Sequence, residues 1–361
     1  MKQLYDIWLS HVVGVTSPNG GRICSSGYGP RLFYSMRNEL GQFDLFTEKQ
    51  IETAENTTVE QLQDIYNLHM ENGIKSVNYT DPRFPHRLKA IGHAPVVLFY
   101  KGDLSLLDSR CTVGVVGSRR CTGEGEKACE KISRELAQAG AVVVSGLAQG
   151  VDTVAHKAAV DAGGRTVAFI GVPLNEYFPK TNKKFQDKLC AEHLVVSEYY
   201  CTYPYYGANF IYRNRLIAAA GDALCVVQAK ERSGSLATVN RAVEYEKPVF
   251  AVPGGIFTPA YSGSNKLLAE GTARVVTAGG QILAWLGFEQ QTAPAQEAEN
   301  LTDSLDEISQ TVLDCMEGAM NANLIIRASG LKAALVKATL TSLEIDGWVQ
   351  RTATGEYIRT K

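Results

Sequence analysis

The feature that most constrains this chain is an alternation, from Thr112 onward, of short apolar runs with helical segments. The runs are rich in β-branched residues and apolar throughout, as a sheet covered on both faces requires. They comprise residues 112–118, 141–146, 165–171, 194–199, 223–229 and 247–254. The helical segments between them comprise residues 124–139, 151–162, 182–191, 210–220 and 235–246. This repetition predicts an α/β fold with a doubly wound, mostly parallel, Rossmann-like sheet.

The segments on either side of this pattern differ from it. Residues 1–80 contain helical apolar spacings without strong strand patterns, which predicts an N-terminal helical module. The polar segment 288–303 has no apolar period and predicts a linker. Helical segments followed by two short alternating strands predict a winged-helix domain over residues 304–361. We therefore assign residues 81–287 to an extended Rossmann domain.

The overall charge excludes one class of nucleic-acid binder. A net charge of −2 leaves no cationic coat over the whole surface, so any anion site must be a local pocket. No apolar run approaches the roughly 18 residues that a membrane span needs. The eight cysteines include no C-x-x-C pair, which argues against a zinc site and a disulfide scaffold. We expect a cytoplasmic protein with no metal, no cofactor and no membrane contact.

Most of the predicted strands end in Gly or Ser, followed by a polar turn. In an open α/β sheet, ligands bind beyond the carboxyl ends of the strands, where amides and helix N-termini favour phosphate groups. The spacing matches neither G-x-G-x-x-G nor the Walker A loop, since the chain has no G-K-[ST]. The strand-end candidates are Gly117, Ser118, Ser145, Gly146, Ser233, Gly234 and Ser235. For any single glycine, tight packing of a strand on a helix is the alternative.

Cationic and amide side chains lie next to these turns. The candidates are Arg119, Lys180, Asn182, Arg213, Asn214 and Arg215. Their positions predict a locally positive site for a nucleic-acid backbone or a phosphorylated ligand. Arg213 and Arg215 lie in an otherwise apolar helix and must reach water, a carboxylate or a ligand, because an unpaired buried charge is costly. One of the two could therefore be a structural anchor.

Two further clusters have both a functional and a structural interpretation. The tyrosine-rich segment 199–212 could stack on unpaired bases or form a packed loop. Asp152 and His156, four residues apart on one helix, could be an acid–base pair or two metal ligands. We favour a structural role, in which the aspartate bonds to the histidine. The sequence has no third metal ligand at the spacing of a known motif, so we expect no metal-binding residues. It also shows no Ser-His-Asp or Cys-His arrangement, so we expect no catalytic residues.

Together these motifs resemble the DprA/Smf family, the DNA-processing proteins of bacterial natural transformation. The resemblance runs through VGVVGSRRCTGEGEKACE, VVVSGLAQGVDTVAHKAAV, YFPKTN, RNRLIAAAGDALCVVQAKERSGSLATVNRAVEYEKPVFAVPGG and SGSNKLLAEGTARVV. It covers about residues 73–287. The segment ASGLKAALVKATLTSLEIDGWVQ resembles the family's winged-helix module. The N-terminal third is a poor version of the family's helix-hairpin-helix or SAM-like segment, and Asn175 stands where relatives often have Asp.

The resemblance implies a mediator that is not an enzyme. Members of the family bind and protect incoming single-stranded DNA through the extended Rossmann domain, dimerise through that domain, and load the RecA recombinase. Single-stranded DNA, RecA and a second copy of the chain are therefore the expected partners. The match assigns phosphate binding to Arg119 of GSR and Lys180 of YFPK, and it includes the R-N-R and S-G-S-L motifs. We expect Arg119 and Lys180 to face one shared groove.

Two other functions remain open at this stage. The lysine-decarboxylase-like phosphoribohydrolases share this type of sheet, and they use a glutamate in a P-G-G-x-G-T-x-x-E loop. In this chain the corresponding loop, SGSLATVNRAVE, lacks that glutamate at the required spacing after Thr238. The third possibility is a winged-helix regulator that senses a nucleotide in its Rossmann domain, which would prefer duplex DNA to a single strand.

Overall fold

The computed structural model describes residues 2–288, 307–316, 318–345, 347–352 and 355–360. The chain divides into two compact units, residues 1–291 and 292–361. The expected linker, 288–303, lies outside the described residues except for its first residue. None of the described helices has the length and apolar character needed to cross a membrane.

The first unit is built on a nine-stranded sheet with the order β1-β2-β6-β5-β4-β3-β7-β8-β9. The strands are β1 Lys75–Asn78, β2 Val97–Gly102, β3 Thr112–Val116, β4 Val142–Ser145, β5 Thr166–Phe169, β6 Leu194–Ser197, β7 Ala223–Val226, β8 Val249–Ala251 and β9 Arg274–Val275. From β6 to β9 all neighbours are parallel, whereas β2 is antiparallel to both β1 and β6. The predicted mostly parallel, doubly wound sheet is confirmed.

Helices cover both faces of this sheet. Against one face pack α7 Gly123–Gln138, α8 Val151–Asp161 and α13 Gly279–Trp285. The other face carries α10 Gly207–Ala220, α11 Ser235–Glu244 and α12 Ser262–Ala269, and α9 Lys183–Glu192 packs on β2 and β6. Alternate strand residues serve the two faces: Val113 and Val115 pack with α7 and α8, whereas Val116 belongs to the core on the α10 side. This double coverage explains why the strands are apolar throughout.

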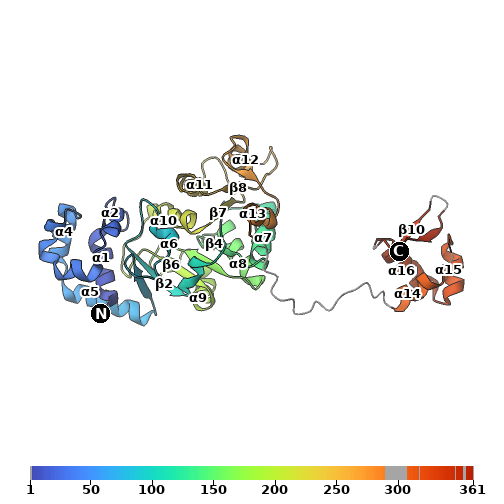
Figure 1. The fold of residues 1–361 in the computed structure, drawn as a ribbon, viewed down its shortest axis with the longest axis horizontal. Helices are drawn as coiled ribbons and strands as arrows, with labels where there is room; N and C mark the ends of the chain where they lie inside the picture. The colour runs from blue at the N-terminus through green and yellow to red at the C-terminus, as the bar shows by residue number, and fades with distance from the viewer. Residues whose placement is uncertain (1, 289–306, 317, 346, 353–354, 361) are drawn as a thin grey trace. The chain divides into compact units, whose positions relative to one another are not determined.

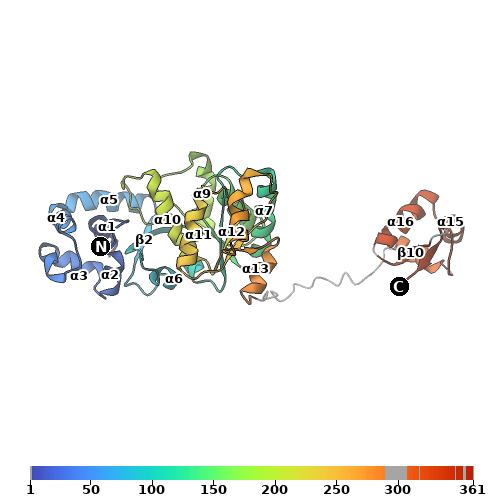
Figure 2. The same cartoon turned by 90° about the horizontal axis from the view of Figure 1, so that it is seen from above.

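The N-terminal helices are part of the same unit. They are α1 Lys2–Val13, α2 Gly20–Ser25, α3 Pro30–Ser35, η1 Arg37–Phe43, α4 Glu48–Asn56 and α5 Val59–Glu71. Figures 1 and 2 both show them beside β2, at the end of the unit remote from α7 and α13. Their buried side chains join one continuous core with the sheet. Strand β1, which the sequence pattern did not indicate, falls within the expected N-terminal module and pairs with β2.

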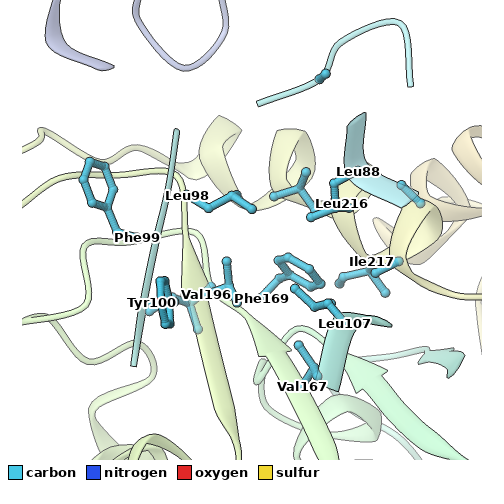
Figure 3. Close-up of a cluster of buried hydrophobic side chains, with 14 of the residues drawn as sticks. Leu88, Leu98, Phe99, Tyr100, Leu107, Val167, Phe169, Val196, Leu216 and Ile217 are labelled. Carbon is cyan, nitrogen blue, oxygen red and sulfur yellow. The ribbon is translucent and has the colours of Figure 1, made fainter. Parts of the chain in front are cut away.

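Helix α10 is the longest element on its face and anchors this core. In Figure 3 its Leu216 and Ile217 lie close to Leu88 of α6 (His86–Lys89) and to Phe169 of β5. All of these side chains are almost completely buried. The carboxyl-terminal half of α10 is fixed by this packing. Its amino-terminal half, with the polar residues Arg213 and Asn214, is therefore held at the carboxyl edge of the sheet.

The second unit has the winged-helix pattern expected from the sequence. Its elements are α14 Glu307–Asp314, α15 Ala322–Ser329, α16 Ala333–Ile345, β10 Val349–Arg351 and β11 Tyr357–Arg359. The two strands pair antiparallel, and the helices bury a small core that includes Val312, Ile325 and Leu340. Asn321 caps α15 by accepting from the Leu324 amide, and Gly330 ends it in the left-handed conformation.

Candidate nucleic-acid interface

A hollow of about 660 Å³ lies at the carboxyl ends of β3, β4 and β7. The chain winds from β3 outward through β4, β5 and β6, and then returns to place β7 on the other side of β3. Direction therefore reverses between β3 and β7, and ligands of open α/β sheets bind at such a reversal. The predicted residues that line the hollow are Gly117, Ser118, Arg119, Arg213, Asn214, Ser233, Gly234 and Ser235.

The loop after β3 is fixed by backbone contacts that require small residues. The Ser118 amide donates to the Gln228 carbonyl (2.8 Å), and the Val151 amide donates to the Ser118 carbonyl (3.2 Å). Gly150 has a φ of 81°, and a Cβ there would lie 2.4 Å from the Ser118 oxygen. At Gly117 a Cβ would lie 2.7 Å from the Val151 side chain. The close approach of this loop to the start of α8 thus depends on glycine at both positions.

Four cationic side chains surround the hollow at the surface. Arg119 and Arg120 come from the loop after β3, and Lys230 and Arg232 come from the loop after β7. All four are exposed, and within the described part of the chain none of them forms a salt bridge. We call these four residues the rim cations. Unpaired and exposed, they are available to an anionic ligand.

Aromatic rings lie beside the rim cations. The Arg119 guanidinium lies over the Phe210 ring at 5.6 Å, and the Phe210 and Phe178 rings are 4.6 Å apart. Together with Gly146 and Pro179, these residues line a second, smaller hollow of about 120 Å³. Its walls combine a cation with two aromatic rings tilted by 37° to each other, which is a favourable environment for an unpaired base.

Lys180 and Asn182 follow this smaller hollow in the chain. Lys180 is exposed and begins the short helix η3 (Lys180–Asn182), directly after Pro179. Pro179 and Arg119 line the same hollow, so the backbone at Lys180 lies at the same edge of the sheet as Arg119. Asn182 has a structural role, because its amide donates to the Leu147 carbonyl (3.1 Å) and to the Thr153 hydroxyl (2.8 Å).

Arg213 forms the floor of the larger hollow. It is buried, and its Nη1 donates to the Gly146 carbonyl at 2.7 Å and to the Phe169 carbonyl. A Cβ on Gly146 would lie 2.5 Å from the Arg213 Nη2 and 2.6 Å from the Asp152 carboxylate. Gly146 is therefore glycine because a buried arginine and a buried aspartate enclose it. Asn214, next to Arg213, ties α10 to the S-G-S loop by donating to the Gly234 carbonyl at 3.3 Å.

Burial changes the pKa values of both charged groups at the floor. Burial raises the pKa of Asp152 to about 6, although the nearby Arg213 opposes this shift. Burial also lowers the pKa of Arg213 to about 10, against the attraction of Asp152. Asp152 is the one acidic residue in the described lining of the hollow. The hollow is therefore net positive, because five cationic side chains line it together with this one carboxyl group.

Arg215 lies outside the hollow, unlike Arg213. Its side chain is 1% exposed, and its Nη1 and Nη2 donate to the two Glu198 oxygens at 2.5 and 2.6 Å. Its Nε donates to the His93 carbonyl at 3.1 Å. Burial disfavours the charge of Arg215, but the Glu198 carboxylate outweighs it and raises the pKa of the guanidinium. Arg215 is thus the structural anchor of the R-N-R motif.

Three other expectations have structural outcomes. Ser145 is buried, and its hydroxyl donates to the Val115 carbonyl at 2.6 Å rather than facing a ligand. The expected bond between Asp152 and His156 is wrong. His156 Nδ1 instead shares a hydrogen bond of 2.6 Å with the Thr166 hydroxyl, and Asp152 accepts from the Ala148 amide at 3.4 Å. Burial lowers the pKa of His156 to about 3, so it is neutral. Among the described residues, no group of three or more metal-ligating side chains gathers.

Sequence reasoning left several lining residues out of the candidate set. Arg120, Lys230, Arg232 and Phe210 line the hollow without having been selected. A usable signal existed, because the segment KERSGS places two cations directly before a predicted phosphate-binding turn. In the tyrosine-rich segment, Tyr199 and Tyr200 are buried, as expected for a packed loop. Tyr205 and Tyr206 are exposed, as stacking on bases would require.

The part of the sequence that forms the sheet and the hollow matches a known family. Residues 75–287 match the family model of DNA recombination-mediator protein A. The chain belongs to this family. Residues 294–355 match the DprA winged-helix domain, which agrees with the elements described in the second unit. The chain is 45% identical over 213 residues to DNA processing protein DprA of Streptococcus pneumoniae, covering 59% of this chain and 74% of that one.

Relatives with solved structures support the DprA family fold. The X-ray structure of DprA from Streptococcus pneumoniae matches with a TM-score of 0.67 and 35% identity, covering 78% of this chain and 96% of that one. A Helicobacter pylori DprA structure, described as showing a unique single-stranded DNA binding mode, matches with a TM-score of 0.54 and 30% identity, covering 59% and 95%. Protein Smf of Escherichia coli is 32% identical over 285 residues, covering 77% of this chain and 75% of that one.

Proposed function

We propose that this DprA-family protein binds single-stranded DNA in the hollow at the carboxyl edge of its sheet, as a recombination mediator that loads RecA. The observation that carries the proposal is the group of rim cations, which are exposed and form no salt bridge with any described residue, around a glycine-rich cavity. A few cations and backbone amides hold a sugar–phosphate chain without reading its sequence. The relative from Helicobacter pylori, described by its single-strand binding, supports this choice of ligand.

The phosphates would contact the predicted strand-end residues. In this proposal phosphates are bound by Arg119, which lines both hollows, and by Lys180, which directly follows Pro179 of the smaller hollow, and the Gly117–Ser118 and Ser233–Ser235 turns supply backbone and hydroxyl donors. Asn214 ties the Ser233–Ser235 turn to α10, and Arg213 holds the neighbouring strand ends at Gly146 and Phe169. An unpaired base would enter the smaller hollow and stack on Phe210, which a base-paired strand does not permit.

Dimerisation is part of the proposal. Strand β9 is the edge of the sheet, and Val275 on it is 62% exposed. Exposed edges and apolar side chains are common sites for association with a second chain. Two linked grooves would hold one strand more strongly than either groove alone. Delivery of that strand to RecA is also part of the proposal, supported by the match to the recombination-mediator family, and its test is the rate at which RecA displaces a single-strand-binding protein with and without this chain.

The central test is a salt titration of affinity for single-stranded and duplex DNA of the same sequence. Five cations contacting phosphates, the four rim cations and Lys180, predict a slope of log affinity against log salt of roughly −3.5 for a single strand. Several unrelated single strands should bind equally, and duplex should bind more weakly. Preference for a duplex operator would favour the regulator instead. Release of free base from nucleoside monophosphates would favour the phosphoribohydrolase.

A further inference from the structure

The turn after β8 exposes two large apolar side chains in succession. Ile256 is 84% exposed and Phe257 is 93% exposed, and in the described part of the chain no other large apolar side chain is as exposed as either. Single apolar residues on a surface are ordinary. Two neighbouring ones, including an aromatic ring with its large area, are costly to keep in water and indicate a contact.

The turn is held rigidly at its base. The Thr258 amide donates to the Gly255 carbonyl at 2.9 Å, which makes Ile256 and Phe257 the two central residues of a β-turn. The Asn265 side chain bonds both backbone groups of Gly254, at 3.0 and 3.1 Å. The two apolar side chains are therefore presented on a fixed support. We call Ile256 and Phe257 the apolar tip.

The apolar tip is continuous with the loop that carries two of the rim cations. Strands β7 and β8 are parallel neighbours, so the segments that follow them leave the same edge of the sheet. The start of α12, four residues after the turn, packs on the loop after β7: the Gly263 amide donates to the Ala229 carbonyl at 2.8 Å. A Cβ on Gly263 would lie 2.5 Å from the Lys230 carbonyl. The tip and Lys230 thus belong to one packed group of loops.

We propose that the apolar tip is a second base-contacting site, at which Phe257 stacks on bases of a single strand whose phosphates lie along Lys230 and Arg232. This inference rests on the proposed function and adds a specific contact to it. Cations beside an exposed aromatic ring are the combination that single strands require. Two side chains offer far less area than the roughly 800 Å² per partner of a stable protein interface, which favours bases over a protein.

The first test compares a normal oligonucleotide with an abasic one of the same length. Phe257→Ala should weaken binding of the normal strand roughly 5- to 150-fold, the range of one lost base stack. It should leave binding of the abasic strand unchanged, because that strand has nothing to stack. Val59→Ala, at an exposed apolar position on α5, is the matched control and should affect neither strand.

The outcomes separate this inference from the proposed function. If Arg119→Ala weakens binding but Phe257→Ala leaves it unchanged, the tip does not contact bases and the groove stands. If the full chain binds neither strand, the groove itself fails. If Phe257→Ala instead changes the mass of the protein in sedimentation without DNA, the tip contacts a second copy, and the base contact is overturned.

A spectroscopic variant tests stacking directly. In the Phe257→Trp protein, added single-stranded DNA should quench the fluorescence of the tryptophan at the tip, because a stacked base quenches indole emission. The Val59→Trp protein should show no additional quenching relative to the unchanged chain. Equal quenching in the two variants would overturn the proposal, since it would come from a change remote from the tip.

Discussion

Two groups of arginines in this molecule differ in their exposure to solvent and in the groups that they contact. At the rim of the hollow, Arg119, Arg120 and Arg232 are exposed and have no carboxylate partner in the described part of the chain. Beneath it, Arg213 and Arg215 are buried, with their donors bound to carbonyls and to Glu198. An exposed cation gains by contacting a phosphate, whereas a buried one is already committed to the fold.

The contrast between the two regions shows why a sequence motif does not by itself define a binding site. R-N-R is three consecutive polar residues, yet their roles differ, since Arg213 supports the floor, Asn214 ties a loop, and Arg215 neutralises a buried glutamate. The rim cations belong to no single motif and come together only through the order of the strands. Variants in the two regions should therefore change different measurements.

The largest effect is expected below the hollow. Arg215→Met leaves Glu198 buried without its partner and should lower the free energy of unfolding by about 3–5 kcal/mol. Denaturant unfolding measures this loss. The double variant Arg215→Met with Glu198→Gln removes the stranded charge and should recover part of the stability. If Arg215→Met weakens DNA binding at full stability, the distinction between the two regions is wrong.

The next effect is expected at the rim. Arg119→Ala should leave the free energy of unfolding within about 0.5 kcal/mol of the unchanged protein, because the side chain is exposed. It should weaken binding to unrelated single strands alike, by about 1.5–3 kcal/mol, the range for a charged hydrogen bond. The salt slope should become shallower by about 0.7. Arg134→Ala, in an exposed pair on α7, is the control and should bind normally.

A pH effect is expected where the two regions meet. Because the pKa of Asp152 is raised from 3.8 to about 6 by burial, the folded chain holds a proton between these values that the unfolded chain has lost. The contribution of Asp152 to the free energy of unfolding should therefore fall as pH rises from 4 to 6, by at most about 1.4 kcal/mol per pH unit. Buried histidines such as His156, whose pKa is lowered, act in the opposite direction in both proteins, so the measurement is the difference in free energy of unfolding between the unchanged protein and Asp152→Asn, which should fall over this range. A pH profile that is the same in both proteins would contradict the assignment.

The smallest effect is expected from the winged helix. Residues 304–361 carry six Lys and Arg against seven Asp and Glu, a net charge of −1, so this segment as a whole does not attract phosphates. Removing residues 304–361 should therefore leave single-strand affinity within about twofold, well under 1 kcal/mol. Affinity measured on both lengths of the protein decides this. A collapse would move the principal DNA site from the sheet to the winged helix.

The sequence predicts the sheet well and the roles of its arginines poorly. Six of the nine strands follow from continuous apolar runs, because burial on both faces leaves a strong signal. Strand β1, with Lys75 and Ser76 exposed or half-buried, lacks this signal at an edge of the sheet. The separation of Arg213 from Arg215 also escapes the sequence, since it depends on Glu198, which lies in another segment. The partner of His156 is likewise on a different element.

Asp6 of α1 accepts hydrogen bonds from Ser76 and Asn78 of β1, and the helices around it share their apolar interior with the sheet. Separating α1–α5 from the sheet would expose apolar surface of both parts to water, so the two parts are not independent domains. A protein that bound α1–α5 would therefore hold the proposed DNA site at a fixed distance and orientation, because both belong to one packed unit.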